Sequence, residues 1–474
     1  MAKILFTASE AFPFAVSGGL GDVIGALPKT LAKIEGNDIR VVLPLYGKVP
    51  DEQRQQMTFL RAITVAVGWR NQYCGIYELK RDGVTWYFLD NEYYFKRGSR
   101  LYGDYDDGER FAFFSTACLE ILPTVDFYPD VIHAHDWHTA LVPILYRTRY
   151  AALPEYRGIK TVFTIHNIQY QGVFDFDRHA DLFNIPDESA SIAEFNGALN
   201  LMKGAVEAAD KVSTVSPTYA EEILYAYYAH GLEGILARNK SKLQGILNGI
   251  DTVRYDPMTD KALTNPFSAR TPAQKAKNKL DLQKDLGLPV SKEIPMVGII
   301  SRLVSHKGLD LVLRVIHDIL NLPLQFVVLG TGDKEYEEAL TEIQAKYPEK
   351  MSVTIDFNSA LASRIYGASD IILMPSQSEP CGLVQMVACR YGAAPLIRRT
   401  GGLKDSVCDA SLGGNGFTFD DYNAHEMLYA LERAVALYAD KKAWRALEVR
   451  ALKCDFSWDA SAKQYMEMYH SLMN

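Results

Sequence analysis

The sequence lacks the patterns that mark a metal site, a disulfide framework or a membrane segment. Its six cysteines are scattered through 474 residues, without a CxxC pair or another ligand-like spacing. No run of about 18 apolar residues occurs, and the apolar start "KILFT" is too short for the core of a signal peptide. We therefore expect a cytoplasmic protein with reduced thiols at Cys74, Cys118, Cys381, Cys389, Cys408 and Cys454.

An excess of positive charge is also missing. Lysine and arginine number 50 against 58 aspartates and glutamates, so the net charge is −8. This balance argues against binding to nucleic acid or to an anionic membrane, and any phosphate site must depend on local basic groups. The hydrophobic content of 48% is typical of a soluble globular chain, and the length predicts two domains of roughly 200 residues each.

Two series of short β-rich runs alternate with helical stretches. Continuous apolar strands between helices predict an α/β fold with parallel, doubly wound sheets in both halves. Residues 74–91 instead predict an antiparallel hairpin that turns at Asp82 and Gly83. The parallel runs are "KILFTAS", "IRVVLPLY", "DVIHAHD", "TVFTIHN" and "KVSTVSP" in the first half, and "PMVGIISRL", "LQFVVLGTG", "SVTIDF", "DIILMPS" and "APLIRRTGG" in the second.

The boundary between the two series is predicted near residues 243–257, "LQGILNGIDTVRYDP". A polar helical stretch follows, and the second strand series starts at Pro295. The last segment, "FSWDASAKQYMEMYHSLMN", has large apolar side chains at helical spacing, which predicts a helix that docks on a core: Trp458, Tyr465, Met468 and Tyr469.

Ligands of doubly wound domains bind at the carboxyl ends of the strands, so a cleft shared by two such domains is the expected site. The stretch "SGGLGDV" (17–23) follows the first strand and can bring backbone N–H groups to an anion. The residue before it, Val16, offers no cation. A tight strand–helix turn without a ligand is the alternative interpretation.

Two more polar clusters follow strands in the first half. In "HAHDWH" (133–138), alternation places His133 and His135 on one face, but no carboxylate or thiol cluster completes a metal site. A polar rim that hydrogen-bonds sugar hydroxyls fits this cluster better. "TIHNIQYQG" (164–172) also ends a strand with histidine and asparagine, for which a satisfied core histidine is the alternative.

The second half places cations and a carboxylate after its strands. "SRLVSHKG" contains Arg302 and Lys307, a planar fork and a point charge suited to a diphosphate. "PSQSEPCGL" contains Glu379 at a turn where a carboxylate can accept from sugar hydroxyls, followed by amides at Gly382 and Leu383. "RRTGGLKD" (398–405) supplies a second glycine pair. Ordinary surface charge is the alternative for either cation alone.

Together these segments resemble the bacterial glycogen synthases, the ADP-glucose-dependent relatives of plant starch synthases. The resemblance extends from "ASEAFPF" to "FSWDASAKQY", almost the full chain, and rests on the order of its motifs: "GGLGDV", "HAHDWH", "TIHNIQYQG", "SPTYAEEI", "LNGID", "SRL…KG", "EPCGL" and "RRTGGLKD". It implies a GT-B fold of two Rossmann-like domains facing a central cleft, here 1–245 on the acceptor side and 246–455 on the nucleotide-sugar side. It also implies that the final helix, 456–474, crosses back onto the first domain.

The resemblance further implies an activity and its residues. The family transfers glucose, with retention, from ADP-glucose to the non-reducing end of an α-1,4-glucan, without a metal or a tightly held cofactor. Asp136 and His166 would line the glucose pocket, with His138 nearer the acceptor. Glu379 would clasp the sugar hydroxyls, and Arg302 and Lys307 would hold the diphosphate. The other donor contacts implied are Ser17, Gly18, Gly19, Asn248, Phe357 (against adenine), Cys381, Gly382, Leu383, Thr400, Gly401 and Gly402.

This assignment agrees with the charges that develop in such a reaction. Breaking the bond between glucose and phosphate builds positive charge on the sugar and negative charge on the departing ADP. Cations and N–H groups on the ADP side stabilise that separation without a protein nucleophile. We expect the charge to be neutralised by Arg302 and Lys307 of the second domain. A covalent scheme with two carboxylates about 5 Å apart is the alternative.

Two departures from the family pattern bear on the donor. Val16 stands where the family has lysine ("KTGGL"), and Gln377 and Ser378 replace arginine and phenylalanine in "PSRFEPCGL". Both changes remove cations from the donor side. The alternatives are therefore a related transferase that uses UDP-glucose or another acceptor, and an inactive protein that binds glucan or nucleotide. The sequence does not disclose the oligomeric state.

Overall fold

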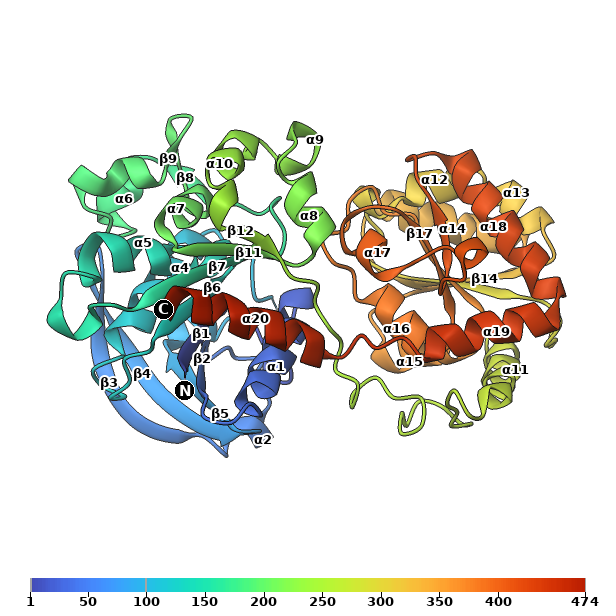
Figure 1. Ribbon diagram of the computed structural model, residues 1–474, viewed down its shortest axis with the longest axis horizontal. Helices are drawn as coiled ribbons and strands as arrows, with labels where there is room; N and C mark the ends of the chain where they lie inside the picture. The colour runs from blue at the N-terminus through green and yellow to red at the C-terminus, as the bar shows by residue number, and fades with distance from the viewer. Residues whose placement is uncertain (1, 99, 474) are drawn as a thin grey trace. The chain divides into compact units, whose positions relative to one another are not determined.

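The computed structural model describes residues 2–98 and 100–473, which divide into two compact units (Figure 1). One unit contains the residues up to Gly249 together with those from Trp458 onward, and the other contains Ile250–Ser457. The chain thus passes between the units twice, first within the predicted boundary region 243–257 and again just before the last helix.

A nine-stranded sheet forms the centre of the described part of the first unit, in the order β12-β11-β7-β6-β1-β2-β5-β4-β3. The strands from β12 to β5 pair in parallel, and β5, β4 and β3 pair antiparallel. Their bounds are β1 Lys3–Thr7, β2 Asp38–Pro44, β3 Thr58–Val67, β4 Arg70–Arg81, β5 Val84–Asp90, β6 Val131–His135, β7 Lys160–Ile165, β11 Lys211–Thr214 and β12 Leu243–Gly245.

Helices cover this sheet, and all five predicted parallel runs of the first half form strands within it. The main helices are α1 Gly19–Ala32, α4 Asp107–Glu120, α5 Leu141–Leu145, α7 Leu201–Ala208, α8 Pro217–Glu222, α10 Glu233–Arg238 and α20 Trp458–Met473. A small separate sheet pairs β8 Val173–Asp175, β10 Ala198–Asn200 and β9 Glu194–Phe195. No sequence pattern predicts these short strands.

The predicted hairpin is confirmed. Arg81 pairs with Val84 across the turn, and Asp82 and Gly83 both have positive φ, 54° and 78°. This is the backbone that a two-residue hairpin turn requires, and it explains the Asp-Gly pair. The structure adds β3 as the edge strand of the sheet, which was not predicted.

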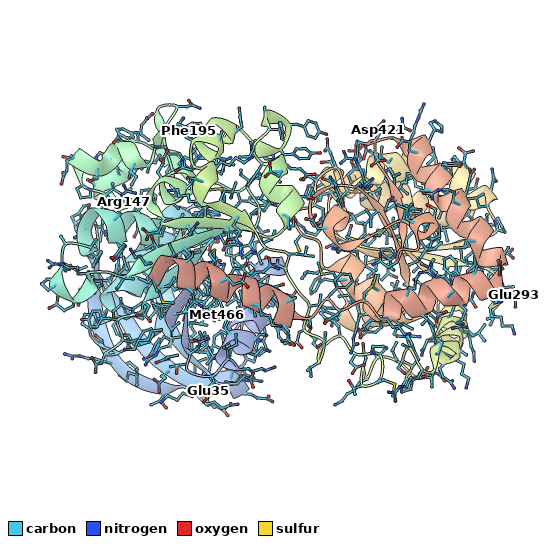
Figure 2. The ribbon with its side chains drawn as sticks, in the orientation of Figure 1. Glu35, Arg147, Phe195, Glu293, Asp421 and Met466 are labelled. Carbon is cyan, nitrogen blue, oxygen red and sulfur yellow. The ribbon has the colours of Figure 1, made fainter. Side chains whose placement is uncertain are left out.

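The last helix docks on the first unit. Tyr465 and Tyr469 of α20 are fully buried, and the Tyr469 hydroxyl lies 2.7 Å from Nδ1 of His133 on β6. Met466, labelled in Figure 2, is also buried and receives a hydrogen bond from the Asn37 side chain at 3.5 Å. Helix α20 therefore completes the core of a unit whose other residues all precede Ile250.

The second unit is built on a parallel sheet of six strands in the order β15-β14-β13-β16-β17-β18. The order reverses at β13, as in a doubly wound fold, so the predicted α/β class is confirmed here too. Its strands are β13 Met296–Ile300, β14 Gln325–Gly330, β15 Met351–Ile355, β16 Ile371–Met374, β17 Ala394–Arg398 and β18 Phe417–Phe419. Its helices are α11 Lys275–Asp285, α12 Leu309–Arg314, α13 Ile316–Asn321, α14 Lys334–Lys346, α15 Ser359–Ala368, α16 Val384–Arg390, α17 Gly401–Ser406, α18 Ala424–Ala439 and α19 Lys441–Leu452.

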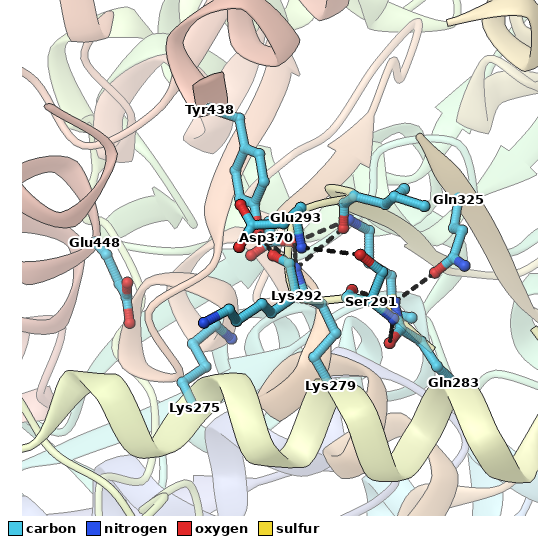
Figure 3. Close-up of polar contacts among 12 residues, drawn as sticks. Lys275, Lys279, Gln283, Ser291, Lys292, Glu293, Gln325, Asp370, Tyr438 and Glu448 are labelled. Carbon is cyan, nitrogen blue, oxygen red and sulfur yellow. Dashed lines mark hydrogen bonds and ion pairs between the residues drawn. The ribbon is translucent and has the colours of Figure 1, made fainter. Parts of the chain in front are cut away.

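Two buried lysines fix the polar helix α11 to this sheet (Figure 3). The Lys279 ammonium donates to Asp370 at 2.8 Å and to the Tyr438 hydroxyl at 2.6 Å, and Asp370 also accepts from the Met296 amide at 2.8 Å. Lys275 donates to three backbone carbonyl groups at 2.8 to 3.1 Å. A buried charge is tolerated only with such partners. The cluster lies at the amino ends of β13 and β16 and so holds the strands whose opposite ends carry the candidate residues.

Candidate functional site

Three adjacent strands of the first unit bring its predicted residues to one edge of the sheet. β1, β6 and β7 pair in parallel, so their carboxyl ends lie together. The glycine-rich loop follows β1, Asp136 follows β6, and His166 follows β7. Asp136 and His166, predicted to act together, are therefore neighbours, and the His166 amide donates to the Asp136 carboxylate at 2.8 Å.

Asp136 is held in an unusual backbone conformation. Its φ is 57°, which non-glycine residues rarely adopt. The carboxylate also accepts from the Asn167 amide at 3.5 Å. Burial raises the pKa of Asp136 to about 7, against the lowering effect of these two amides. A strained residue with a raised pKa at a strand end has the character of a functional group.

His166 is a neutral imidazole at physiological pH. Burial lowers the pKa of His166 to about 3, and its Nε2 lies 3.0 Å from Nδ1 of His135. His135 is fully buried behind it and determines its orientation. A neutral imidazole can exchange a hydrogen bond with a sugar hydroxyl without adding a positive charge at the site.

The prediction that His133 and His135 form a polar rim for sugar hydroxyls is wrong. Both side chains are fully buried. His133 bonds the hydroxyls of Tyr469 and Thr164, at 2.7 and 2.5 Å. Alternation correctly placed both histidines on one face, with ring centroids 4.1 Å apart, but α20 covers that face. These histidines support the site from behind.

Glu10 is a further residue of this edge that no sequence pattern singled out. It is buried, with 3% of its surface exposed, and its carboxylate accepts from the amides of Ser17, Gly18 and Gly21, the last two at 3.2 and 3.3 Å. Burial raises the pKa of Glu10 to about 7, with a further increase from Asp136, although the three amides lower it. Three amides of the glycine loop are therefore already occupied by a carboxyl group of the protein itself.

This arrangement limits the backbone amides that the loop can offer to a nucleotide-sugar. Ser17 and Gly18 were predicted donor contacts, and both amides donate to Glu10 in this structure. Ser17, Gly18 and Gly19 are nevertheless exposed. Their role in binding a nucleotide-sugar stays a prediction, and for the first two it would require Glu10 to release them.

His138 and Asn248, the other predicted residues of this unit, are both buried. His138 packs among aromatic rings, with its ring centroid 4.2 Å from that of Tyr102 and 4.3 Å from that of Trp137. Burial lowers its pKa to about 3. The side-chain oxygen of Asn248, Oδ1, is buried and has no hydrogen-bond partner within the part of the chain that the structure describes. An unsatisfied buried amide of this kind suits a ligand contact.

In the second unit, the structure pairs Lys307 with Glu379. The Lys307 ammonium donates to both carboxylate oxygens, at 2.9 and 2.7 Å. Only 17% and 9% of the two side chains are exposed, and the Ser376 hydroxyl also donates to Glu379 at 3.0 Å. Lys307 follows β13 and Glu379 follows the neighbouring strand β16, so both lie at the carboxyl edge of the sheet.

Close backbone contact explains two glycines of these turns. A Cβ on Gly308 would lie 2.1 Å from the Pro375 carbonyl oxygen, and one on Gly401 would lie 2.0 Å from that of Glu379. Both glycines also have positive φ, 77° and 43°. The loops after β13, β16 and β17 are thus packed backbone against backbone, and this packing fixes the position of Glu379.

The same packing occupies some of the predicted donor amides. The Thr400 amide donates to the Arg398 carbonyl oxygen at 2.9 Å, and the Gly402 amide donates to that of Glu379 at 3.2 Å. In this structure these two amides donate to carbonyl oxygens of the protein. The role of Thr400–Gly402 in binding the nucleotide-sugar therefore stays a prediction. Roles for Gly401 and for the turn Cys381–Leu383 also remain predictions.

Arg302 and Phe357 are exposed beside this edge. Arg302 lies between β13 and Lys307, and 91% of the Phe357 ring is exposed just after β15. An exposed ring of that size at a strand end has the form of a surface for a nucleobase. Gln377 stands where the family pattern has arginine. The Arg398 guanidinium donates to its backbone carbonyl oxygen at 2.8 Å, so a cation still lies beside this position.

No cluster of three or more His, Cys, Asp or Glu side chains suited to a metal ion occurs within residues 2–98 and 100–473. Over the same residues, no helix has the length and apolar character needed to span a bilayer.

Comparisons with known proteins agree with this geometry. Residues 3–238 match the starch synthase catalytic domain family, and residues 284–446 match the glycosyl transferases group 1. The chain is 48% identical to the glycogen synthases of Anoxybacillus flavithermus and Bacillus cereus, over 99% of its length and 98% and 100% of theirs. The catalytic domain of starch synthase IV from Arabidopsis thaliana, bound to ADP and acarbose, is similar with a TM-score of 0.93 at 34% identity, covering 100% of this chain and 99% of that one.

Two doubly wound units with polar residues at the carboxyl ends of their strands define a glycosyltransferase of the GT-B fold. The chain belongs to the family of bacterial glycogen synthases and starch synthases. The expected fold class and enzyme class are confirmed.

Proposed function

We propose that this enzyme transfers glucose, with retention, from ADP-glucose to the non-reducing end of an α-1,4-glucan in the cytoplasm, without a metal ion. The observation that carries the proposal is the buried Lys307–Glu379 pair at the carboxyl edge of the second sheet. The similarity to a starch synthase domain whose structure contains ADP and acarbose supports the donor and the glucan acceptor.

Lys307 is the group that stabilises the departing ADP. Glu379 holds its ammonium with two hydrogen bonds, so the charge is fixed in place before the reaction begins. Such a preorganised cation is effective because negative charge grows on the diphosphate as the glycosidic bond breaks. Arg302, which is exposed nearby, supplies a second cation with a planar fork for phosphate oxygens.

Glu379 has a second task, toward the sugar. Its carboxylate already accepts from Lys307 and Ser376 and is oriented by the close packing of Gly401. A carboxylate so oriented can accept hydrogen bonds from glucose hydroxyls. In the first unit, Asp136 and neutral His166 are the groups assigned to glucose, with His138 assigned to the acceptor.

The donor is tested directly by a radiolabel assay. Purified enzyme with glycogen is supplied with ADP-[14C]glucose or UDP-[14C]glucose, and incorporation into the polymer is measured. We expect a kcat/KM for ADP-glucose at least tenfold above that for UDP-glucose, with no change on addition of EDTA. Preference for UDP-glucose would support the related transferase, no incorporation from either donor would support an inactive binding protein, and EDTA sensitivity would contradict the metal-free reaction.

Val16→Lys is expected to tighten binding of ADP-glucose. Val16 is 38% exposed, so a longer side chain has room to extend, and the ammonium would add a charge-assisted hydrogen bond worth about 1–2 kcal/mol. Isothermal titration calorimetry at low and high salt measures the effect, which should shrink with added salt.

Val16→Met is the matched control, because it lengthens the side chain without a charge. Equal affinities for the lysine and methionine variants would show that the donor phosphates do not lie near residue 16. The UDP-glucose or altered-acceptor alternative would then gain support.

A further inference from the structure

Two cysteines of the second unit meet at a point that the transfer reaction does not use. Cys389 lies in the last turn of α16, and Cys454 follows α19. They approach because Gly392, just after α16, leaves no side chain between the two helices. A Cβ on Gly392 would lie 3.1 Å from Cγ of Leu452, so the end of α19 packs directly on the turn that follows α16.

The two sulfur atoms share one hydrogen-bond donor. The Asn415 side-chain amide donates to Sγ of Cys389 at 3.5 Å and to Sγ of Cys454 at 3.4 Å. The Cys454 thiol donates to the Arg450 carbonyl oxygen at 3.4 Å, and each thiol shifts the pKa of the other, as expected of neighbouring sulfur atoms. Asn415 is itself buried and fixed by a further bond to the Ser406 carbonyl oxygen at 3.0 Å.

The environment makes the two thiols unequal. The neighbouring Cys389 thiol, together with the hydrogen bond from Asn415, lowers the pKa of Cys454 to about 7 although burial raises it. The neighbouring Cys454 thiol and burial raise the pKa of Cys389. Cys454 is partly exposed, whereas Cys389 is fully buried. This is the arrangement of a reactive thiolate beside a resolving thiol.

We propose that Cys389 and Cys454 are a redox-active pair that peroxide converts into a reversible disulfide. The Cys454 thiolate attacks one oxygen of hydrogen peroxide, the O–O bond breaks, and hydroxide leaves to give a sulfenic acid. The Cys389 sulfur then attacks the Cys454 sulfur, its proton passes to the departing hydroxide, and a disulfide forms. The first hydroxide takes up the proton that Cys454 released on ionising, so that two thiols are oxidised, one peroxide is reduced, and two waters are produced.

Cys408 provides an internal comparison. It is exposed, and its amide donates to the same Asn415 side chain at 2.9 Å. Its thiol donates to the Asp409 carbonyl oxygen at 4.0 Å, whereas Nδ2 of Asn415 donates to the sulfur atoms of Cys389 and Cys454. If exposure alone governed oxidation, Cys408 would react first, whereas the pair predicts that Cys454 forms the disulfide.

The test uses the reduced full-length enzyme, treated with a small excess of hydrogen peroxide and then alkylated and digested without reductant. Mass spectrometry should find the peptides of Cys389 and Cys454 joined, and titration of the denatured protein should show the loss of two of its six thiols, restored by dithiothreitol. Cys454→Ser and Cys389→Ala should each abolish the joined peptide, whereas Cys408→Ser should leave it unchanged.

Melting temperatures of the variants establish that they are folded. If Cys389→Ala does not fold, Cys454→Ser, which alters a partly exposed residue, carries the test alone. A disulfide to Cys408, a sulfinic acid at Cys454 without a link to Cys389, or six unreacted thiols would each overturn the proposal.

Discussion

Lys307→Ala is expected to lower kcat about 10²- to 10³-fold, the range for the loss of one preorganised group that stabilises charge in a transition state. The ammonium is held by both oxygens of Glu379, at 2.9 and 2.7 Å, so in the wild-type enzyme no reorganisation is needed when charge develops on ADP. Steady-state kinetics with ADP-glucose and glycogen measure the loss, which should fall on kcat more than on the KM for glycogen.

Two controls accompany this variant. Lys346→Ala removes an exposed lysine at the end of α14 and should keep wild-type kinetics. Lys307→Arg keeps the positive charge but places it on a planar guanidinium instead of a compact ammonium, so it should recover part of the rate that Lys307→Ala loses. An effect of Lys307→Ala confined to the KM for glycogen would move this residue to the acceptor side of the reaction.

Glu379→Gln should cause a loss of similar size, about 10²-fold or more in kcat, with little change of shape. The substitution keeps the side-chain length and one acceptor oxygen, but it removes the charge that holds the Lys307 ammonium and accepts from Ser376. The same kinetic assay measures it, and Glu335→Gln, at an exposed position of α14, is the matched control.

The double variant with Lys307→Ala distinguishes the two tasks of Glu379. If the carboxylate only positions Lys307, the double variant should be no slower than Lys307→Ala alone. If it also binds the sugar, as we propose, the double variant should lose a further factor, because residues that act partly as a unit combine non-additively. Retention of more than half of the wild-type kcat by Glu379→Gln would contradict both tasks.

The strands and the elements that carry the candidate residues could be predicted because their signals are local. Short β-rich runs such as 131–135 and 371–374 each follow an aspartate and form parallel strands as expected. The pair Asp82-Gly83 predicts the hairpin, and both residues have the positive φ that its turn requires. The short strands β8, β9 and β10 have no such signal, since only their pairing with one another defines them.

The site was predicted less completely, because its details depend on contacts between distant residues. Strand alternation gives the face on which His133 lies, but Tyr469, far along the chain, decides that this face is buried. In the sequence, Glu10 interrupts the apolar stretch that begins with the first strand, and this interruption is the local feature that points to it. Nothing local shows that its carboxylate turns to the amides of Ser17 and Gly18. A glycine-rich loop predicts exposed amides but not which anion occupies them.

The position of α20 has a consequence for biosynthesis. The first 249 residues leave the ribosome with a core that lacks Tyr465 and Tyr469, because these arrive only with the last helix. At about 5–20 residues per second, the roughly 200 residues of the second unit take about 10–40 s to translate. During that interval the face of β6 that carries His133 lacks the two tyrosines that cover it in the finished unit. Helix α20 is thus made after the second unit, although it completes the unit that precedes it in the chain.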